Sequence, residues 1–196
     1  MSPDRQTIAL YDAQAAAYAA CAPAERPRLA AFLADLPAGG HVLDLGCGPG
    51  HAAAQMVKAG FEVTALDASA EMAAYARRTY GLEVMVADFH HVTGDAVYDG
   101  VWANFSLLHA PRDEMPGHLA ALVRALKPGG SLHIGLKTGT GEARDGLGRL
   151  YTYYTEDEIA GLLEAAGLAV LSRDTGADPG FDGVLAPWIV LRARRQ

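Results

Sequence analysis

Three glycines in alternate positions follow an acidic residue near the start of the chain. Asp44 precedes Gly46, Gly48 and Gly50, with a mostly apolar run before them and a helix-compatible segment after them. This order predicts a strand, a tight turn and a helix. Glycine permits positive φ angles and lets a ligand approach the backbone amides, which at a helix N-terminus favour an anionic or polar group. We therefore expect a ligand-binding loop, in which Asp44 orients the loop or meets a positive group.

The spacing of the glycines separates two classes of nucleotide cofactor. The dinucleotide fingerprint places a third small residue where this chain has His51. Pro49 also removes a backbone donor that a pyrophosphate would use. An uncharged nucleoside with an amino-acid tail needs fewer donors, which favours S-adenosylmethionine (SAM). A glycine turn without a ligand is the alternative.

A second acid follows the next expected strand. Asp67 directly follows the expected strand 61–66 and lies 21 residues after Gly46. In a doubly wound sheet, an acid at this place lies beside the first loop and accepts hydrogen bonds from ribose hydroxyls. Ser69 is expected to cap the next helix. We therefore predict that Asp67 binds ribose; helix capping is its alternative role.

Four segments together resemble the class I SAM-dependent methyltransferases. Residues 42–50 resemble the first motif of that family, and Y-D-x-x-A-x-x-Y at 11–18 resembles the helix that covers the cofactor in its small-molecule members. Residues 98–109, which end in Leu-His, and the L-K-P-G-G turn at 126–130 also match the family. The resemblance extends over nearly the whole chain from residue 11.

The resemblance implies a set of cofactor contacts at the loop and at the strand ends. By this resemblance, Asp88 is expected to bind the amino group of adenine and Phe89 to pack on the adenine ring. Asn104 is expected to lie under the methionine part of SAM. Asn104 is not followed by two prolines and an aromatic, so methylation of nucleic-acid bases or of glutamine is disfavoured. The expected cofactor residues are Asp44, Gly46, Cys47, Gly48, Gly50, Asp67, Ala68, Met72, Ala87, Asp88, Phe89 and Asn104.

Methyl transfer requires alignment of donor and acceptor and exclusion of water, and it needs a general base only for a weakly acidic acceptor. The catalytic candidates are His109, Tyr11 and Tyr18, each of which has packing as its alternative role.

The acceptor is expected to meet residues after the fifth strand. Arg144 and Arg149 lie in or beside a glycine-rich segment, 138–150, which reads as a mobile lid or as a disordered surface loop. Their guanidinium groups suit a carboxylate or phosphate, and Tyr153 follows them. These three residues are the predicted substrate-binding set. No metal is expected, because His90 and His91 are not accompanied by the acids and amides that divalent-metal methyltransferases use.

Composition limits the class of protein. The chain has 196 residues, 51% of them hydrophobic and 20% charged, with a net charge of −7 and two cysteines. It reads as one domain with a helical cap at 1–38 and a core at 39–196. No apolar run is long enough to span a membrane, and the N-terminus lacks a signal-peptide core. The negative charge argues against nucleic-acid binding. We expect a cytoplasmic monomer or weak homodimer that acts on a small molecule without membrane association.

Strands and helices are expected to alternate until two final strands. The fold class predicted from this pattern and from the resemblance is α/β, Rossmann-like and doubly wound. The mainly parallel seven-stranded sheet has helices on both faces and one antiparallel strand near an edge. Two alternative functions remain. One is a non-catalytic SAM-binding regulator. The other is a dinucleotide-dependent oxidoreductase, which is less favoured because this chain has no evident catalytic Tyr-x-x-x-Lys motif. The expected strands are 41–45, 61–66, 83–87, 98–103, 131–137, 168–172 and 187–191.

Overall fold

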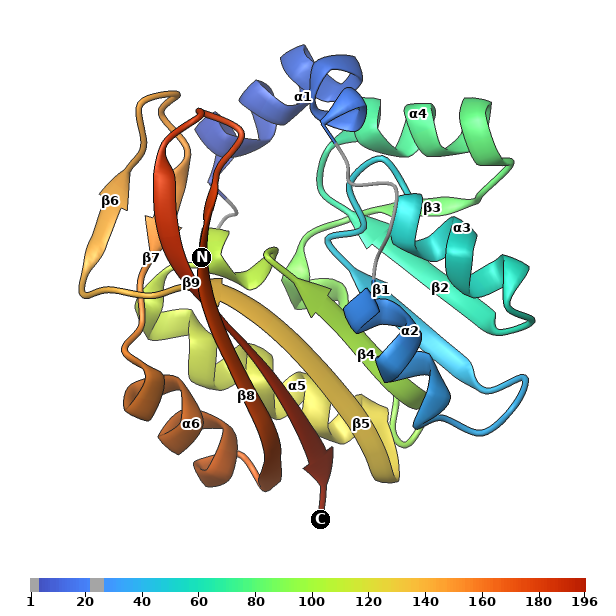
Figure 1. Ribbon diagram of the computed structural model, residues 1–196. Helices are drawn as coiled ribbons and strands as arrows, with labels where there is room; N and C mark the ends of the chain where they lie inside the picture. The colour runs from blue at the N-terminus through green and yellow to red at the C-terminus, as the bar shows by residue number, and fades with distance from the viewer. Residues whose placement is uncertain (1–3, 22–26) are drawn as a thin grey trace.

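The computed structural model describes residues 4–21 and 27–196 and is built around a seven-stranded sheet (Figure 1). Its strands are β1 (His41–Leu45), β2 (Glu62–Asp67), β3 (Val84–Val86), β4 (Tyr98–Asn104), β5 (Leu126–Lys137), β8 (Leu168–Pro179) and β9 (Leu185–Arg195). The strand order is β3-β2-β1-β4-β5-β9-β8. In this order, the strands β3, β2, β1, β4 and β5 run parallel to one another, whereas β9 is antiparallel to both of its neighbours, β5 and β8. The predicted fold class is confirmed.

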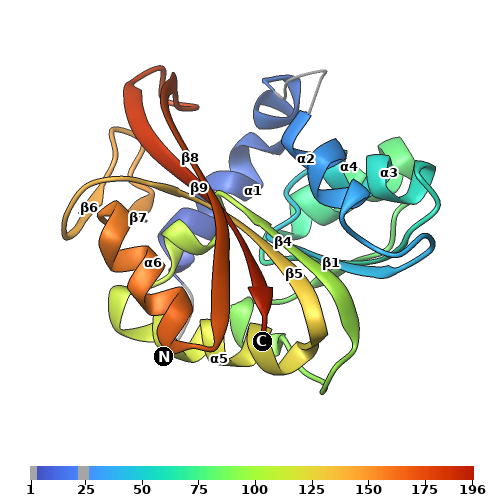
Figure 2. The same cartoon turned by 60° about the horizontal axis from the view of Figure 1, so that its bottom comes forward.

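Helices cover both faces of this sheet (Figure 2). They are α1 (Arg5–Ala20), α2 (Pro27–Ala34), α3 (His51–Lys58), α4 (Ala70–Tyr80), α5 (Met115–Ala125) and α6 (Glu156–Ala165). On one face, Phe32 of α2 and Met56 of α3 pack with Trp102 of β4. On the other, Leu119 of α5 and Ile159 of α6 belong to the largest apolar cluster. Within 4–21 and 27–196, no helix is long and apolar enough to cross a membrane.

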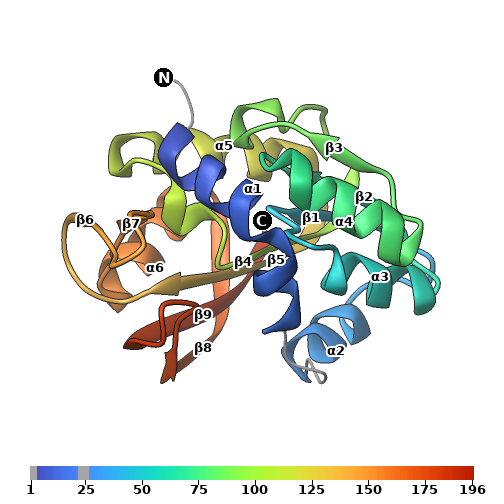
Figure 3. The same ribbon diagram turned by 90° about the horizontal axis from the view of Figure 1, so that it is seen from above.

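The helix α1 lies across the carboxyl ends of the parallel strands (Figure 3). Asp12 of α1 anchors it, because its Oδ1 accepts hydrogen bonds from the Ser69 hydroxyl at 2.6 Å and from the Glu71 amide at 3.2 Å. Ser69 also caps α4 by accepting from the Met72 amide, as predicted. The residues that link α1 to α2, at 22–26, lie outside the described ranges. The arrangement places the aromatic residues of α1 over the sheet edge where α/β proteins bind ligands.

Three regions differ from the sequence expectation. β5 begins at Leu126 and not at residue 131, because Leu126 already pairs with Tyr98, and the predicted turn forms an irregularity within the strand. The segment 138–150 is not a loop throughout, since β6 (Glu142–Arg144) pairs antiparallel with β7 (Leu150–Thr152). The last two strands are also much longer than expected and form a β8/β9 hairpin. Its residues Gly176 and Trp188 face each other, and a Cβ at 176 would lie 2.4 Å from the indole. Gly176, which the sequence pattern marks as part of a loop, therefore makes room for cross-strand packing against Trp188.

Candidate functional site

The carboxyl edge of the sheet holds a first cavity of about 870 Å³, including its open mouth. It lies under α1, beside the loop after β1 and the ends of β2 to β4. Eight of the expected cofactor residues line it: Gly46, Gly48, Asp67, Ala68, Met72, Asp88, Phe89 and Asn104. Asp44 and Cys47 line a neighbouring cavity, whereas Gly50 and Ala87 line neither. Gly50 instead starts α3 with a φ of 83°, where a Cβ would collide with Ala76 of α4.

The glycine loop has the shape that a ligand-binding turn requires. Gly46 has a φ of 69° and lies so close to Ser106 that a Cβ would come within 2.4 Å of that side chain. The amides of Gly46 and Cys47 both donate to the Leu66 carbonyl, which ties the loop to β2. Gly48 has a φ of 55° and lines both cavities, with nothing nearer to a built Cβ than Tyr18 at 3.8 Å. A side chain at 48 would therefore fill ligand space.

Asp67 joins this loop to the next strand end. Its Oδ2 accepts from the Gly48 amide at 2.7 Å, and its Oδ1 accepts from the Ser69 amide at 2.8 Å. Burial raises the pKa of the carboxyl group, and these two hydrogen bonds oppose the shift. Each carboxylate oxygen has a second lone pair. The group can thus hold the loop and still accept a hydroxyl from the cavity.

The end of β4 is held by a histidine that sequence reasoning did not consider. The Nε2 of His133, on β5, lies 3.0 Å from the Oδ1 of Asn104. Burial lowers the pKa of His133 to about 3, so the ring is neutral. The next residue, Phe105, has a φ of 57°, which costs free energy in a non-glycine residue. Asn104 and Phe105 both line the two cavities, so this strained turn forms part of the junction between them.

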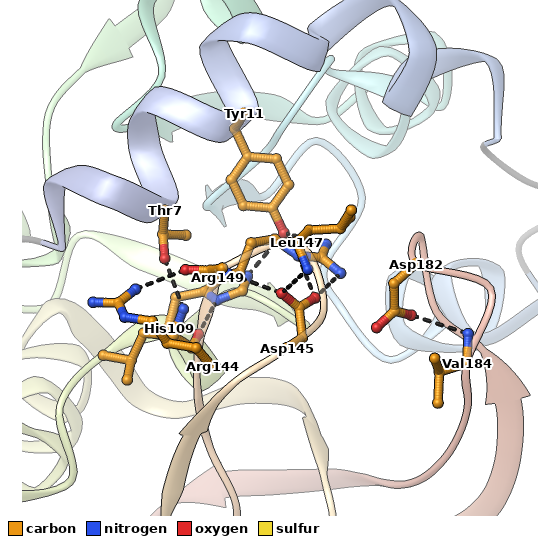
Figure 4. Close-up of polar contacts among 11 residues, drawn as sticks. Thr7, Tyr11, His109, Arg144, Asp145, Leu147, Arg149, Asp182 and Val184 are labelled. Carbon is orange, nitrogen blue, oxygen red and sulfur yellow. Dashed lines mark hydrogen bonds and ion pairs between the residues drawn. The ribbon is translucent and has the colours of Figure 1, made fainter.

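Tyr11 and His109 form a hydrogen-bonded pair beneath α1 (Figure 4). The Nδ1 of His109 lies 2.6 Å from the Leu150 carbonyl, which can only accept, so Nδ1 carries the proton. The Nε2 therefore accepts from the Tyr11 hydroxyl at 2.9 Å. Burial lowers the pKa of His109 to about 4 and raises that of Tyr11 well above its usual value. Both groups are neutral near pH 7.

Arg149 supports the same pair from the β6/β7 hairpin (Figure 4). Its side chain is 1% exposed, and its Nε and Nη2 donate to the Oδ2 of Asp145 at 2.8 and 2.6 Å. Its Nη1 donates to the Tyr11 hydroxyl at 3.1 Å. The Asp145 carboxylate also accepts from the amides of Leu147 and Arg149, which closes the hairpin turn. This buried ion pair explains why residues 138–150 form an ordered hairpin.

A second, wider cavity of about 1820 Å³ with its mouth adjoins the first. Its wall combines cations and aromatic rings. The Nζ of Lys137 lies 4.2 Å from the ring centre of Tyr151, and the guanidinium of Arg28 lies 4.4 Å from that of Trp188. Burial lowers the pKa of Lys137. Within the described chain, no carboxylate forms an ion pair with Lys137.

The expected substrate-binding residues are not brought together. Arg144 is exposed, forms an ion pair with Asp4 and lines neither cavity. Tyr153 also lines neither cavity and stacks on Tyr151. Arg149 reaches the second cavity. Of the catalytic candidates, Tyr11 and Tyr18 line both cavities and pack edge to face with ring centres 5.3 Å apart.

Comparison with known proteins points to methyltransferases. A family model for a methyltransferase domain matches residues 42–130. Malonyl-acyl-carrier-protein O-methyltransferase from Enterobacter lignolyticus is 41% identical over 106 residues, which cover 52% of this chain and 41% of that protein. Methyltransferase GfsG from Streptomyces halstedii is 33% identical over 181 residues, which cover 77% of this chain and 64% of that protein. The chain thus spans less than two thirds of either relative.

A solved structure extends the likeness to the whole chain. The 1,6-didemethyltoxoflavin-N1-methyltransferase of Burkholderia thailandensis, solved with S-adenosylhomocysteine (SAH), is 26% identical with a TM-score of 0.75. The match covers 100% of this chain and 92% of that one. The chain belongs to the class I SAM-dependent methyltransferases. The cofactor of this family is SAM. The open space at Gly48 and the half-buried carboxylate of Asp67 fit a nucleoside.

Three polar residues of this methyltransferase were missed at the sequence level. Lys137 ends β5, so its place at a carboxyl strand end was a usable signal. His133 gave none, because a lone histidine within an apolar strand does not indicate its partner. Asp145 was read only as part of a polar loop, whereas its role depends on the fold of the hairpin.

Proposed function

We propose that this methyltransferase transfers a methyl group from SAM to a small acidic or phenolic molecule. The observation that carries the proposal is that the two cavities share Tyr11, Tyr18 and Asn104 in their walls. Donor and acceptor must meet in line at one place, and these shared residues mark such a place. SAM supplies, when bound, a methyl group on a positively charged sulfonium.

The first cavity is proposed to hold the cofactor. The backbone of the loop at Gly46 and Gly48 would receive the methionine part, beside Asn104. Asp67 would accept the ribose hydroxyls, and Asp88 with the Phe89 ring would receive adenine. His133 has a positioning role in this scheme, because it fixes the amide of Asn104.

The second cavity is proposed to hold the acceptor. Lys137 places an ammonium group against its wall without an ion-pair partner among the described residues, so an anionic oxygen is the matching group. Tyr151, Phe181 and Trp188 offer ring faces and edges that suit an aromatic ligand. Arg149 is already bound to Asp145, so we assign it to positioning Tyr11 and not to acceptor recognition.

The acceptor is proposed to enter already ionised. The Nε2 of His109 accepts the Tyr11 proton, and the ring has a pKa of about 4, which makes it a weak base. A carboxylate or phenolate needs no base, so Tyr11 and His109 would orient the acceptor and exclude water. The expected pH dependence of kcat/KM then follows the pKa of the acceptor and not a histidine pKa.

The partner proposed is therefore a small molecule, without nucleic acid or membrane, and the protein is proposed to act as a monomer or weak homodimer. The net charge of −7 supports this choice, because an anionic polymer would be repelled. A regulator that binds SAM without turnover is the competing function.

The test is a screen of small carboxylates, phenols, amines and thiols with SAH release as the readout. Turnover of acidic or phenolic compounds supports the proposal, and SAM binding without turnover of any class favours the regulator. With a confirmed acceptor, Lys137→Met should raise KM by about ten- to a hundredfold, because a charge-assisted contact is lost. Its effect on SAM affinity should stay within about twofold. Lys58→Met, at an exposed position on α3, is the matched control.

A further inference from the structure

Three metal-ligating side chains meet at one wall of the first cavity. His90 belongs to the short 3-10 turn η1 (Phe89–His91), Glu114 ends the turn η3 (Arg112–Glu114), and His118 lies on α5. The Nε2 of His90 lies 3.3 Å from the Oε2 of Glu114, and the Nε2 of His118 lies 3.5 Å from the same oxygen. All three ligand atoms lie within 4.8 Å of one another.

The two nitrogen-to-oxygen separations, 3.3 and 3.5 Å, match a four-coordinate metal centre, whereas the two imidazole nitrogens, which lie within 4.8 Å of each other, would have to approach on binding. Bonds of about 2.0–2.1 Å in tetrahedral geometry place neighbouring ligand atoms roughly 3.3–3.4 Å apart. Two imidazoles and one carboxylate form a donor set that zinc and related divalent transition metals accept. Calcium and magnesium prefer oxygen ligands, so this set does not suit them.

A further observation points to a ligand at this cluster. His118 is 5% exposed, and within the described residues its Nε2 has no hydrogen-bond partner. The Nδ1 of His90 lies 3.5 Å from the Oδ1 of Asp88, which is longer than the hydrogen bonds by which carboxylates orient metal-bound imidazoles, and this oxygen already accepts from the His90 amide at 3.0 Å. The neighbouring His91 differs, because its Nδ1 lies 2.9 Å from Asp88 and it is not part of the cluster.

We propose that His90, Glu114 and His118 bind one divalent transition-metal ion of the zinc class. All three residues line the first cavity, so the fourth coordination position faces that cavity. The ion would join η1 to the start of α5 and thereby fix Phe89, whose ring packs edge-on against His118. From the sequence, no metal was expected at His90, because Glu114 and His118 lie 24 and 28 residues further along the chain.

The test uses tag-free, full-length protein titrated with CoCl₂ and then with ZnCl₂. Wild type should bind one Co²⁺ with visible absorption bands of tetrahedral intensity, and Zn²⁺ should displace it. His90→Ala removes a partly exposed ligand, and Glu114→Gln keeps the shape of its side chain. Each should weaken Co²⁺ binding by at least about tenfold. His91→Ala is the matched control and should change the affinity by less than about twofold.

A second readout is the thermal midpoint, which ZnCl₂ should raise in wild type and in His91→Ala but not in His90→Ala. Circular dichroism checks that each variant is folded. The proposal is overturned if folded wild type binds Co²⁺ no more tightly than His90→Ala, or if His91→Ala loses as much affinity. Either result would make the cluster an internal polar contact.

Discussion

The two cavities differ in how the chain builds them. Apart from α1, the first is lined by residues between 46 and 118, most of them beside the ends of neighbouring parallel strands. The second shares the glycine loop and the end of β4 with the first, and it adds residues from α2, the end of β5, the β6/β7 hairpin and the β8/β9 hairpin. The first depends mainly on backbone shape and the second on side chains from distant segments. The comparison indicates that the cofactor side follows from local motifs, whereas the acceptor side follows from tertiary packing.

The largest expected effect is a loss of folding stability when the buried ion pair beside the second cavity is broken. Arg149→Met removes the ion-pair partner of Asp145 and leaves a carboxylate with 6% side-chain exposure held only by the backbone amides of residues 147 and 149. The free energy of unfolding should fall by about 3–5 kcal/mol, as expected for breaking a buried pair. Urea unfolding gives the value.

The control for this change is the double variant Arg149→Met/Asp145→Leu. It removes both charges and should regain part of the lost stability, because no unpaired charge remains buried. A loss below about 1 kcal/mol in the single variant would mean that the hairpin opens to water without cost. The wall of the second cavity would then not depend on this pair.

A second prediction concerns pH and the pair formed by Tyr11 and His109. The pKa of His109 is about 4 in the folded protein against an ordinary value of 6.5, so the unfolded chain binds its proton first as pH falls. The stability that neutral His109 contributes is complete above pH 6.5 and is lost between 6.5 and 4. The slope should be on the order of 1 kcal/mol per pH unit.

Urea unfolding of wild type and His109→Gln between pH 7 and 5 measures that slope. The amide oxygen of glutamine can still accept from Tyr11, but it does not titrate. The variant should therefore show a smaller pH dependence than wild type. Equal slopes in the two proteins would place the titration on other groups, such as His133.

The third prediction tests the first cavity. Asp67→Ala removes the carboxylate that we assign to ribose and should weaken SAM and SAH by about ten- to a hundredfold. Calorimetry measures both affinities, and Asp95→Ala, at an exposed loop position, is the control. Tight binding of NADH without SAM binding, or an unchanged SAM affinity in a folded variant, would contradict the assignment.

Local chemistry explains why much of the fold was predictable. The residues of β1 were predicted from the apolar run before the glycines, and the helix cap at Ser69 is present as expected. Helix caps and strand-to-loop transitions depend on neighbouring residues, so the sequence carries them directly. The mainly parallel sheet with one antiparallel strand followed from the alternation of elements and from the family resemblance.

The acceptor side was less predictable, because residues such as Gly176 and Arg149 contact partners that only the folded structure brings near. Gly176 accommodates Trp188 across the β8/β9 hairpin, whereas the sequence suggested a polar loop between two short strands. Arg149 was expected at a mobile surface and is buried against Asp145. In both cases the partner lies on another strand or across a turn, which residue type alone does not reveal.

The smallest expected effect is that of replacing Arg144, the cation that the sequence predicted for acceptor binding. Lys137 is the cation that the structure places at the second cavity. Arg144 is exposed and bound to Asp4, and exposed ion pairs contribute little. Arg144→Met should therefore leave the unfolding midpoint nearly unchanged, and it should change the KM of an anionic acceptor by less than about twofold. Lys137→Met, by contrast, removes the ammonium group at the second cavity. Steady-state kinetics of both variants with one acceptor makes the comparison. If Arg144→Met raised KM as much as Lys137→Met, the β6/β7 hairpin would have to move on binding so that Arg144 left Asp4 and reached the acceptor, as the sequence first suggested.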